Sequence, residues 1–119
     1  MPYTSEEDVQ MIIFGLIAGA GDAKSNFYQA ISLVRDHKYE EAEELIHQGE
    51  AALLEAHKAQ TRLITNEANG NKTDIGILMI HAQDHLMNAI LVKELLNNLI
   101  SMQKDINALK EKLEGNDNG

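Results

Sequence analysis

The sequence predicts an all-α fold: a single antiparallel three-helix bundle with up-down-up topology. Apolar residues recur at helical spacing along the whole chain, and no stretch alternates apolar and polar residues for long enough to indicate a strand. The only proline is Pro2, so no proline interrupts a helix after the N-terminus. Short breaks at residues 36–38 and 66–72 separate three helical stretches. Short links favour antiparallel neighbours, so we expect one helical domain over residues 1–119.

The first helix is expected over about residues 5–35. Hydroxyl groups at Thr4 and Ser5 can cap its N-terminus, and three acidic residues follow where the helix dipole is positive. Gly15, Gly19 and Gly21 each weaken the helix by roughly 1 kcal/mol relative to alanine, so we expect close packing against another helix, or a kink. Its predicted buried face contains Val9, Ile12, Ile13, Leu16, Ala20, Phe27, Ile31 and Val34.

The second helix is expected over about residues 39–65. Its first turns hold four glutamates, which the positive end of the helix dipole favours. Its apolar row consists mostly of small residues that permit close approach of a neighbouring helix: Ala42, Leu45, Gly49, Ala52, Ala56, Ala59 and Leu63.

The third helix is expected over about residues 74–113, followed by a frayed tail at 114–119. It carries two rows of residues at alternating spacings of three and four. The row predicted to face the other two helices is Leu78, Ala82, His85, Ala89, Val92, Leu96, Leu99, Gln103 and Ile106. The second row is apolar except for polar residues near its start and Asn98: Ile77, His81, Asp84, Asn88, Leu91, Leu95, Asn98 and Met102. Two rows let one helix contact its own bundle and another chain, so we predict a homo-oligomer built around this helix.

Asp84 is the most informative polar residue in the second row. A carboxylate in an apolar row is costly unless it is paired or bound to a metal. If identical chains meet around a rotation axis, each brings its Asp84 close to the same point, where either protonation or a shared cation relieves the repulsion. Carboxylate oxygens suit a hard ion such as Mg²⁺ or Ca²⁺. Pairing of Asp84 with a lysine or arginine in a groove is the alternative.

Composition and charge exclude several classes of protein. The formal net charge is −9, and the ten Lys and Arg residues are scattered, which argues against a nucleic-acid-binding protein. The chain has no cysteine, which excludes disulfides, cysteine-ligated zinc and thiol catalysis. Its longest apolar stretch, residues 11–20, is far short of the roughly 20 residues that span a membrane, and acidic residues precede it. We therefore expect a cytoplasmic protein that does not insert into a membrane.

His81 and His85 lie four residues apart, one turn along the same helix. A zinc hydrolase of the His-Glu-x-x-His type would have glutamate next to the first histidine, where this chain has Ala82. A metal site formed by His81, Asp84 and His85 is a second reading. The third reading is nucleophilic catalysis, in which one imidazole attacks phosphorus and the other stabilises the phosphate. On spacing alone a His-x-x-x-His pair is more often structural than catalytic.

Helix geometry separates the side chains of this segment. At about 100° per residue, Asp84 lies about 60° to one side of His81, and His85 lies about 40° to the other. Asp84 can therefore face an oligomer axis while His81 opens at the flank of the interface. By the same geometry Gln83 lies about 200° from His81, so it can reach a phosphate on His81 only from a neighbouring chain.

The heptapeptide HAQDHLM at residues 81–87 closely resembles the signature of the enzyme IIA component of the lactose/cellobiose (also chitobiose) family of the bacterial phosphotransferase system. The segments EANG at 67–70 and GDAKS at 21–25 are weaker matches to the same family. The resemblance spans nearly the whole chain, and a seven-residue signature at this place on a third long helix is highly specific.

This resemblance implies a fold and a chemistry. Family members are trimers whose subunits together form a nine-helix bundle. His81 would accept a phosphoryl group from the phosphocarrier protein HPr and donate it to a cysteine of the sugar-specific IIB component, which acts with a membrane IIC permease. Asp84 would bind a divalent cation, usually assigned as Mg²⁺, on the three-fold axis, and His85 and Gln83 would line the phosphorylation site.

The resemblance therefore predicts a phosphotransferase component in the uptake of a β-linked disaccharide of the cellobiose, lactose or chitobiose type. An apolar patch around His81 would bind HPr, because a chain of charge −9 does not attract it by charge alone. Met79, Leu86 and Met87 can contribute to this patch, although core packing is the more common role for any one such residue. A non-enzymatic helical oligomeric adaptor with a structural metal site is the alternative function, and a metal-dependent hydrolase using His81 and His85 is a further rival.

Overall fold

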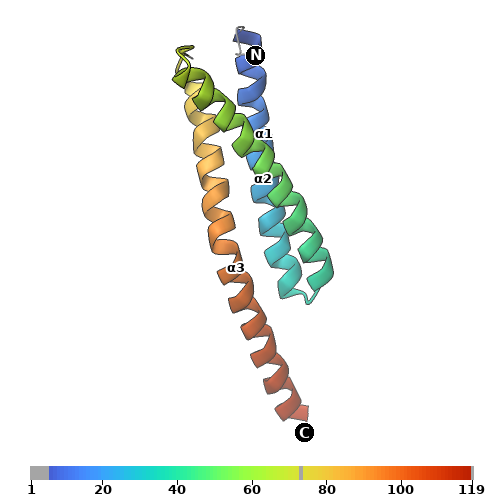
Figure 1. Cartoon of the computed structure of the whole chain (residues 1–119). Coiled ribbons are helices and arrows are strands. Elements are labelled where there is room, and N and C mark those ends of the chain that lie inside the picture. The colour runs from blue at the N-terminus through green and yellow to red at the C-terminus, as the bar shows by residue number, and fades with distance from the viewer. Residues whose placement is uncertain (1–5, 73, 119) are drawn as a thin grey trace.

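A computed structural model describes residues 6–72 and 74–118. Within these ranges the chain forms no strand and three helices: α1 (Glu6–Arg35), α2 (Tyr39–Ala68) and α3 (Ile77–Asn118). The helices alternate in direction and form one elongated bundle of 71 × 20 × 19 Å (Figure 1). None of them, over its described residues, has an apolar stretch long enough to cross a bilayer. The predicted all-α class and the order of three helices are confirmed, and assembly of several copies stays a prediction.

His37 ends α1 and turns the chain toward α2. Its φ of 65° lies in the left-handed region, a conformation that glycine adopts most readily. The backbone N–H of His37 donates to the carbonyl of Val34 (3.0 Å), and that of Lys38 donates to the carbonyl of Leu33 (2.8 Å). These two bonds form a Schellman motif, which satisfies the last carbonyl groups of α1 and permits a tight link.

Gly70 ends α2 in the same way, with a φ of 94°. The N–H groups of Gly70 and Asn71 donate to the carbonyls of Glu67 and Asn66 at 3.0 and 3.1 Å. The predicted end of this helix near residue 65 is therefore too early, because the left-handed glycine ends the helix and residues 66–68 remain within α2.

The predicted bounds of the third helix also need correction at both ends. α3 begins at Ile77 instead of residue 74, and the N–H of Ile80 donates to the carbonyl of Gly76. It continues to Asn118 instead of ending near residue 113, so the tail predicted to fray is helical up to that residue. Apart from Glu114, the residues that extend the helix are Gly115, Asn116, Asp117 and Asn118, which have low helix propensity, so local propensity does not predict this extension.

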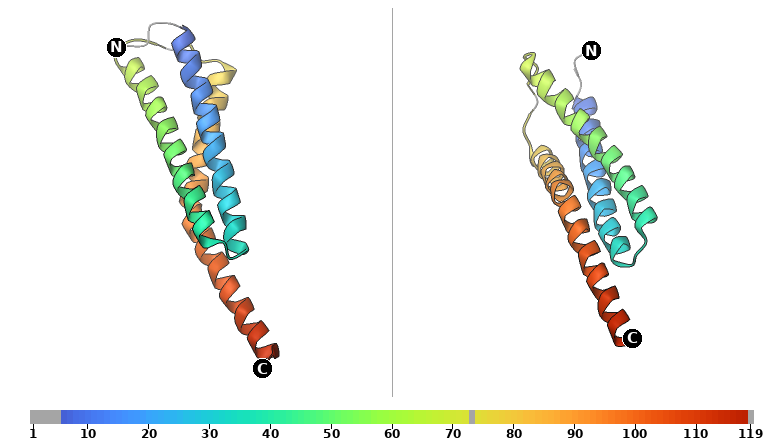
Figure 2. Two further views of the ribbon diagram at one scale, coloured as in Figure 1. Left: turned by 90° about the vertical axis from the view of Figure 1, so that its right-hand side faces the viewer. Right: turned by 60° about the horizontal axis from the view of Figure 1, so that its bottom comes forward.

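The core lies where α1 contacts both of the other helices. Leu16 and Phe27 of α1 are completely buried, as is Leu86 of α3, and Leu53 of α2 is 5% exposed. Small residues surround these side chains, among them Ala20, Ala23, Ala30, Ala56, Ala82 and Ala89. The other two views show that α3 continues past the end of the α1–α2 hairpin, so its C-terminal part is not covered by the bundle (Figure 2). The core therefore supports the first half of α3 more than its end.

Two glycines are in close contact with a neighbouring helix. A Cβ at Gly49 would lie 2.7 Å from Cε1 of Phe27, and one at Gly19 would lie 3.3 Å from the carbonyl oxygen of Ala52. The expected compensation by close packing is therefore found at Gly19. Gly15 and Gly21 have no such contact, because a Cβ at either position would meet nothing within 4 Å.

The buried face of α3 differs in part from the row predicted to face the bundle. Its buried residues are Ala82, Leu86, Ala89, Leu96 and Asn107. Several members of the predicted row are not fully buried: His85 is only half-buried, and Leu78, Leu99 and Ile106 are 37%, 40% and 43% exposed. The rotation of α3 about its own axis buries Leu86 in the core instead of the adjacent His85. The apolar periodicity alone did not predict which of the two residues is buried.

A second, apolar face of α3 has no partner within the described chain. We call its members the exposed seam: Leu91, Leu95, Met102, Ile106, Leu109 and Leu113, which are between 43% and 64% exposed. Their spacings of three, four and seven residues place them along one side of the helix. Its first three members were predicted to lie in the row that contacts other copies.

Asn107 attaches α3 to the turn between α1 and α2. It is 2% exposed, and its Nδ2 donates to the carbonyl oxygen of Val34 (2.8 Å) and to the hydroxyl of Tyr39 (3.0 Å). Its Oδ1 accepts a hydrogen bond from Gln103 Nε2 at 3.0 Å. Because every polar group of this buried amide is satisfied, it can fix the register of α3 against the hairpin.

Candidate functional site

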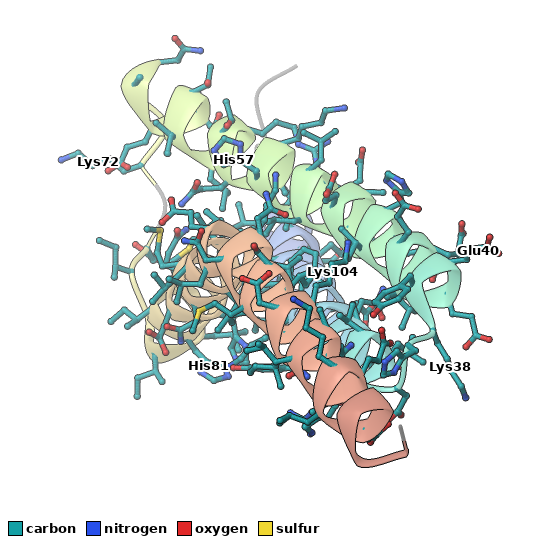
Figure 3. All side chains as sticks on the ribbon, turned by 90° about the horizontal axis from the view of Figure 1, so that it is seen from below. Lys38, Glu40, His57, Lys72, His81 and Lys104 are labelled. Atoms are coloured by element: carbon teal, nitrogen blue, oxygen red, sulfur yellow. The ribbon has the colours of Figure 1, made fainter. Side chains whose placement is uncertain are left out.

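His81 and His85 form a contacting pair on the first half of α3. Their Nε2 atoms are 3.0 Å apart, and their rings meet edge to face, with centroids 4.3 Å apart and an interplanar angle of 88°. His81 is exposed and His85 is half-buried. The one-turn spacing, together with the burial of Ala82 and Leu86, places both rings beside the core-facing side of the helix. Figure 3 shows His81 on the side of the bundle away from α2.

The short distance between the two nitrogens restricts their protonation. Two lone pairs at 3.0 Å would repel each other, so one Nε2 carries a hydrogen that it donates to the other. The accepting ring then has a nucleophilic nitrogen, and the donating ring has an N–H group beside it. This arrangement suits an acceptor of a phosphoryl group, since the nucleophile and a donor for the resulting phosphoryl oxygens lie side by side.

Asp84 lies on the exposed side of α3, close in angle to the exposed seam. In the described part of the chain it forms no ion pair with lysine or arginine, so the alternative of a paired Asp84 is not found within one chain. Among residues 6–72 and 74–118, no group of three or more His, Asp or Glu residues could hold a metal ion. The reading in which His81, Asp84 and His85 form a metal site in one chain therefore has no support in the geometry of the described residues. The predicted site shared by several copies needs Asp84 alone from each chain.

Gln83 faces the groove between α2 and α3, away from His81. It is half-buried, and its Oε1 accepts a hydrogen bond from Gln60 Nε2 of α2 at 2.6 Å. Its own Nε2 lies 3.8 Å from the sulfur of Met79. The structure thus brings His81 and His85 together within one chain but does not bring Gln83 to them. Contact of Gln83 with a phosphate on a neighbouring copy stays a prediction.

An apolar groove lies beside Gln83. It has a volume of about 290 Å³ and is lined by Leu63, Ile64, Glu67, Ile75, Met79, Ile80 and Gln83. Of the three residues predicted to form an apolar patch, Met79 lines this groove, Met87 is 55% exposed, and Leu86 is completely buried in the core. Leu86 therefore has the core-packing role that was the alternative for each of these residues, because it packs in the same buried cluster as Leu16 and Phe27 of α1.

The sequence assigned Gln60 no role in the site and did not predict the part of the groove formed by α2. A single glutamine on a helix surface has no distinguishing local pattern. Its significance comes from a tertiary contact with α3 across 23 residues of sequence.

Comparison with known proteins decides the family. Residues 11–104 match the model of the lactose/cellobiose-specific IIA subunit of the phosphotransferase system. The chain belongs to this IIA family. The resemblance inferred from residues 81–87 is therefore confirmed, and those residues lie inside the matched range.

Curated relatives of this IIA chain agree over most of its length. The lactose-specific EIIA component of Staphylococcus epidermidis is 39% identical over 100 residues, which cover 84% of this chain and 96% of the relative. The galactose-specific EIIA component of Lactococcus lactis is 38% identical over 108 residues, which cover 91% of this chain and 93% of the relative.

Solved structures of IIA proteins are similar to the whole bundle. The cellobiose-specific enzyme IIA of Bacillus anthracis has a TM-score of 0.81 and 42% identity, covering 89% of this chain and 95% of that protein. PtcA of S. mutans has a TM-score of 0.79 and 34% identity, covering 85% and 99%. As a IIA component, the chain has a phosphocarrier role in sugar uptake, and its partners are HPr and a IIB component.

Proposed function

We propose that His81 accepts a phosphoryl group from phospho-HPr and passes it to a cysteine of the cognate IIB component during uptake of a β-linked disaccharide. The observation that carries this proposal is the contact between the Nε2 atoms of His81 and His85 at 3.0 Å, on an exposed face of α3. Membership of the IIA family supports phosphoryl transfer as the chemistry of this pair.

Phosphoryl transfer takes place in two steps, from HPr to His81 and from His81 to IIB, and in each step one bond to phosphorus forms while another breaks. The lone pair of His81 Nε2 attacks phosphorus, a P–N bond forms, and the bond between phosphorus and its donor in HPr breaks, leaving the electron pair on HPr. In the second step the IIB thiolate attacks the same phosphorus, and the electron pair of the P–N bond returns to His81.

His85 supplies the hydrogen-bond donor in this scheme. In the resting pair its Nε2–H donates to the lone pair of His81 Nε2, a bond that aligns the nucleophile. When phosphorus takes that lone pair, the same N–H group can turn to a phosphoryl oxygen, where a bond to an anion is stronger than the bond it replaces. His85 thereby stabilises negative charge that appears only on transfer.

We further propose that three copies assemble through the exposed seam and bring their Asp84 side chains together at the axis. The exposed leucines give such an interface its apolar area. One Asp84 carboxylate per chain, which forms no ion pair among the described residues, fits a hard divalent cation such as Mg²⁺. The cation would neutralise the clustered carboxylates. Asp84→Leu should then leave an assembled chain whose thermal unfolding no longer responds to a chelator, and an unfolded monomer would contradict this account.

The experiment is phosphorylation of the chain by phosphoenolpyruvate, enzyme I and HPr. The parent chain should gain one acid-labile phosphate, His81→Ala should gain none, and His47→Ala, an exposed histidine of α2, should behave like the parent. A chain that gains no phosphate would favour the adaptor function, and phosphate retained by His81→Ala would overturn the assignment to His81.

A further inference from the structure

We propose that Gln60 is a positioning residue of the phosphoryl-transfer site. By donating a hydrogen bond to Gln83 Oε1, it fixes the Gln83 amide so that its N–H group is available to a phosphoryl group on His81 of a neighbouring copy. This inference rests on the proposed function, because it concerns the same site in the assembled protein.

The contact between the two glutamines is short and connects two helices. Gln60 Nε2 of α2 lies 2.6 Å from Gln83 Oε1 of α3, and both side chains are half-buried. Within the described part of the chain, the Gln83 amide nitrogen has the sulfur of Met79 at 3.8 Å as its one hydrogen-bond acceptor, and a thioether is a weak acceptor. The oxygen of Gln83 is therefore engaged within the chain, while its nitrogen can still donate to a stronger acceptor.

Symmetry brings this nitrogen toward the histidines of another copy. Viewed along α3, His81 lies about 60° to one side of Asp84, and Gln83 lies about 100° to the other side. If the copies are related by a rotation axis that runs beside the Asp84 face of α3, each copy contacts its two neighbours through the two opposite sides of that helix. The flank with His81 and His85 in one copy thus meets the flank with Gln83 in its neighbour.

The orientation of the Gln83 amide then decides whether it helps or opposes transfer. An N–H group aimed at a phosphoryl oxygen stabilises the charge on it, whereas a carbonyl oxygen aimed there repels it. Gln60 selects the first orientation because it occupies the Gln83 oxygen with a donor. An acceptor at position 60 would attract the Gln83 N–H group instead and turn its carbonyl oxygen outward.

Three substitutions of Gln60 separate hydrogen bonding from packing. Gln60→Lys keeps a donor, Gln60→Met keeps the length without a polar group, and Gln60→Glu offers only an acceptor. For transfer from phospho-HPr at saturating HPr, we expect Gln60→Lys to stay within about twofold of the parent. Gln60→Met should be slower by about threefold to tenfold, and Gln60→Glu slower by tenfold or more, below the hundredfold or larger loss typical of deleting a direct donor.

The control for added charge is the adjacent residue Thr61, which is exposed. Thr61→Lys and Thr61→Glu introduce the same charges one residue away and should transfer at the parental rate. The Gln60 and Thr61 variants are also compared by thermal unfolding, which reports any loss of packing. If Gln60 served only in packing, the transfer rates of the Gln60→Met and Gln60→Glu variants would follow their thermal stabilities and not their hydrogen-bonding groups.

The Gln83→Ala background tests the direct link between the two glutamines. With Gln83 removed, Gln60→Glu should slow transfer no further, because the two substitutions act through one contact. Equal rates in the Gln60→Lys and Gln60→Glu variants, or a full effect of Gln60→Glu in the Gln83→Ala background, would overturn the inference. Either outcome would leave the proposed function intact as long as the parent chain takes phosphate on His81. A parent chain that takes no phosphate on His81 would reject the proposed function itself.

Discussion

The side chain of Phe27 in α1 leaves no room for a side chain at position 49 of α2. Its buried ring lies against the backbone of α2 at Gly49, where a Cβ would come within 2.7 Å of Cε1. At Gly15 the same added Cβ would meet nothing within 4 Å. Gly15 and Gly49 lower helix propensity equally, but an added side chain would clash with a neighbouring helix only at Gly49.

Alanine substitution should separate these two glycines. Gly15→Ala should raise the free energy of unfolding by about 0.5–1 kcal/mol, because it increases helix propensity without a clash. Gly49→Ala should lower it by about 1–2 kcal/mol, because overpacking of the Phe27 ring exceeds the gain in propensity. Chemical denaturation of both variants is the measurement, and equal shifts of the same sign would contradict the packing described for Phe27.

His85 provides the corresponding test in the site. His85→Ala should still take phosphate on His81, but at a rate lower by on the order of a hundredfold, the effect expected when one donor to developing charge is removed. Rapid-quench measurement of transfer from phospho-HPr gives this rate, with His57→Ala on α2 as the exposed control. An unchanged rate would mean that the 3.0 Å contact between the histidines does not assist transfer.

At the scale of elements, α3 is attached to the hairpin near both ends of the shared bundle. The Gln60–Gln83 bond connects it to α2 at one end, and Asn107 bonds to Val34 and Tyr39 at the other. Between them the contact is apolar and is made mainly with α1. The polar contacts fix register, while the apolar contacts supply most of the stabilisation.

Replacement of Asn107 should reveal this register function. Asn107→Leu removes the hydrogen bonds to Val34, Tyr39 and Gln103, and should lower the free energy of unfolding by about 1–3 kcal/mol. Asn97→Leu, at an exposed position of the same helix, should change it by less than about 0.5 kcal/mol. Thermal and chemical unfolding measure both values, and a neutral Asn107→Leu would contradict the register function.

The sequence was sufficient to predict the existence of these elements but not all of their ends and faces. Apolar periodicity predicted three helices because each buries one face over many turns. The end of α2 was misplaced because residues 66–68 have the composition of a loop, whereas the left-handed Gly70 is what stops the helix. On α3, His85 and Leu86 are adjacent, and only packing against α1 selects which of them is buried.

The candidate site could be predicted where it depends on one helix and not where it depends on two. The spacing of His81 and His85 implies their contact, since residues four apart share a face. The Gln60–Gln83 bond depends on how α2 crosses α3, and the signature that marks Gln83 does not indicate Gln60 as its partner. The same limit applies to the apolar groove, whose walls come from both helices.

At the scale of the whole molecule, the bundle has more apolar surface than one chain can bury. The exposed seam runs along α3 from Leu91 to Leu113, and the last part of it lies beyond residue 104, where the match to the IIA family ends. A row of exposed leucines on a helix is typical of an interface between copies. The proposed assembly would bury this surface, which the fold of a single described chain leaves exposed.

Charge placed in the exposed seam tests this assembly. Leu95→Glu should produce a helical monomer, because each copy would bring a glutamate into the shared interface. Leu54→Glu, at a residue of α2 that is 53% exposed, should assemble like the parent. Sedimentation gives the mass of both variants and circular dichroism their helix content. A Leu95→Glu variant that assembles normally would place the interface elsewhere.

The most direct test of the central claim is to locate the phosphate on the histidine ring. The chain is labelled with ¹⁵N-histidine and phosphorylated by phosphoenolpyruvate, enzyme I and HPr, and its ring nitrogens are then observed by NMR. We predict one phosphorylated histidine per chain, His81, with phosphorus on Nε2 and its signal absent from His81→Ala. Phosphorus on His85, or a chain that remains unphosphorylated while HPr is charged, would contradict the account.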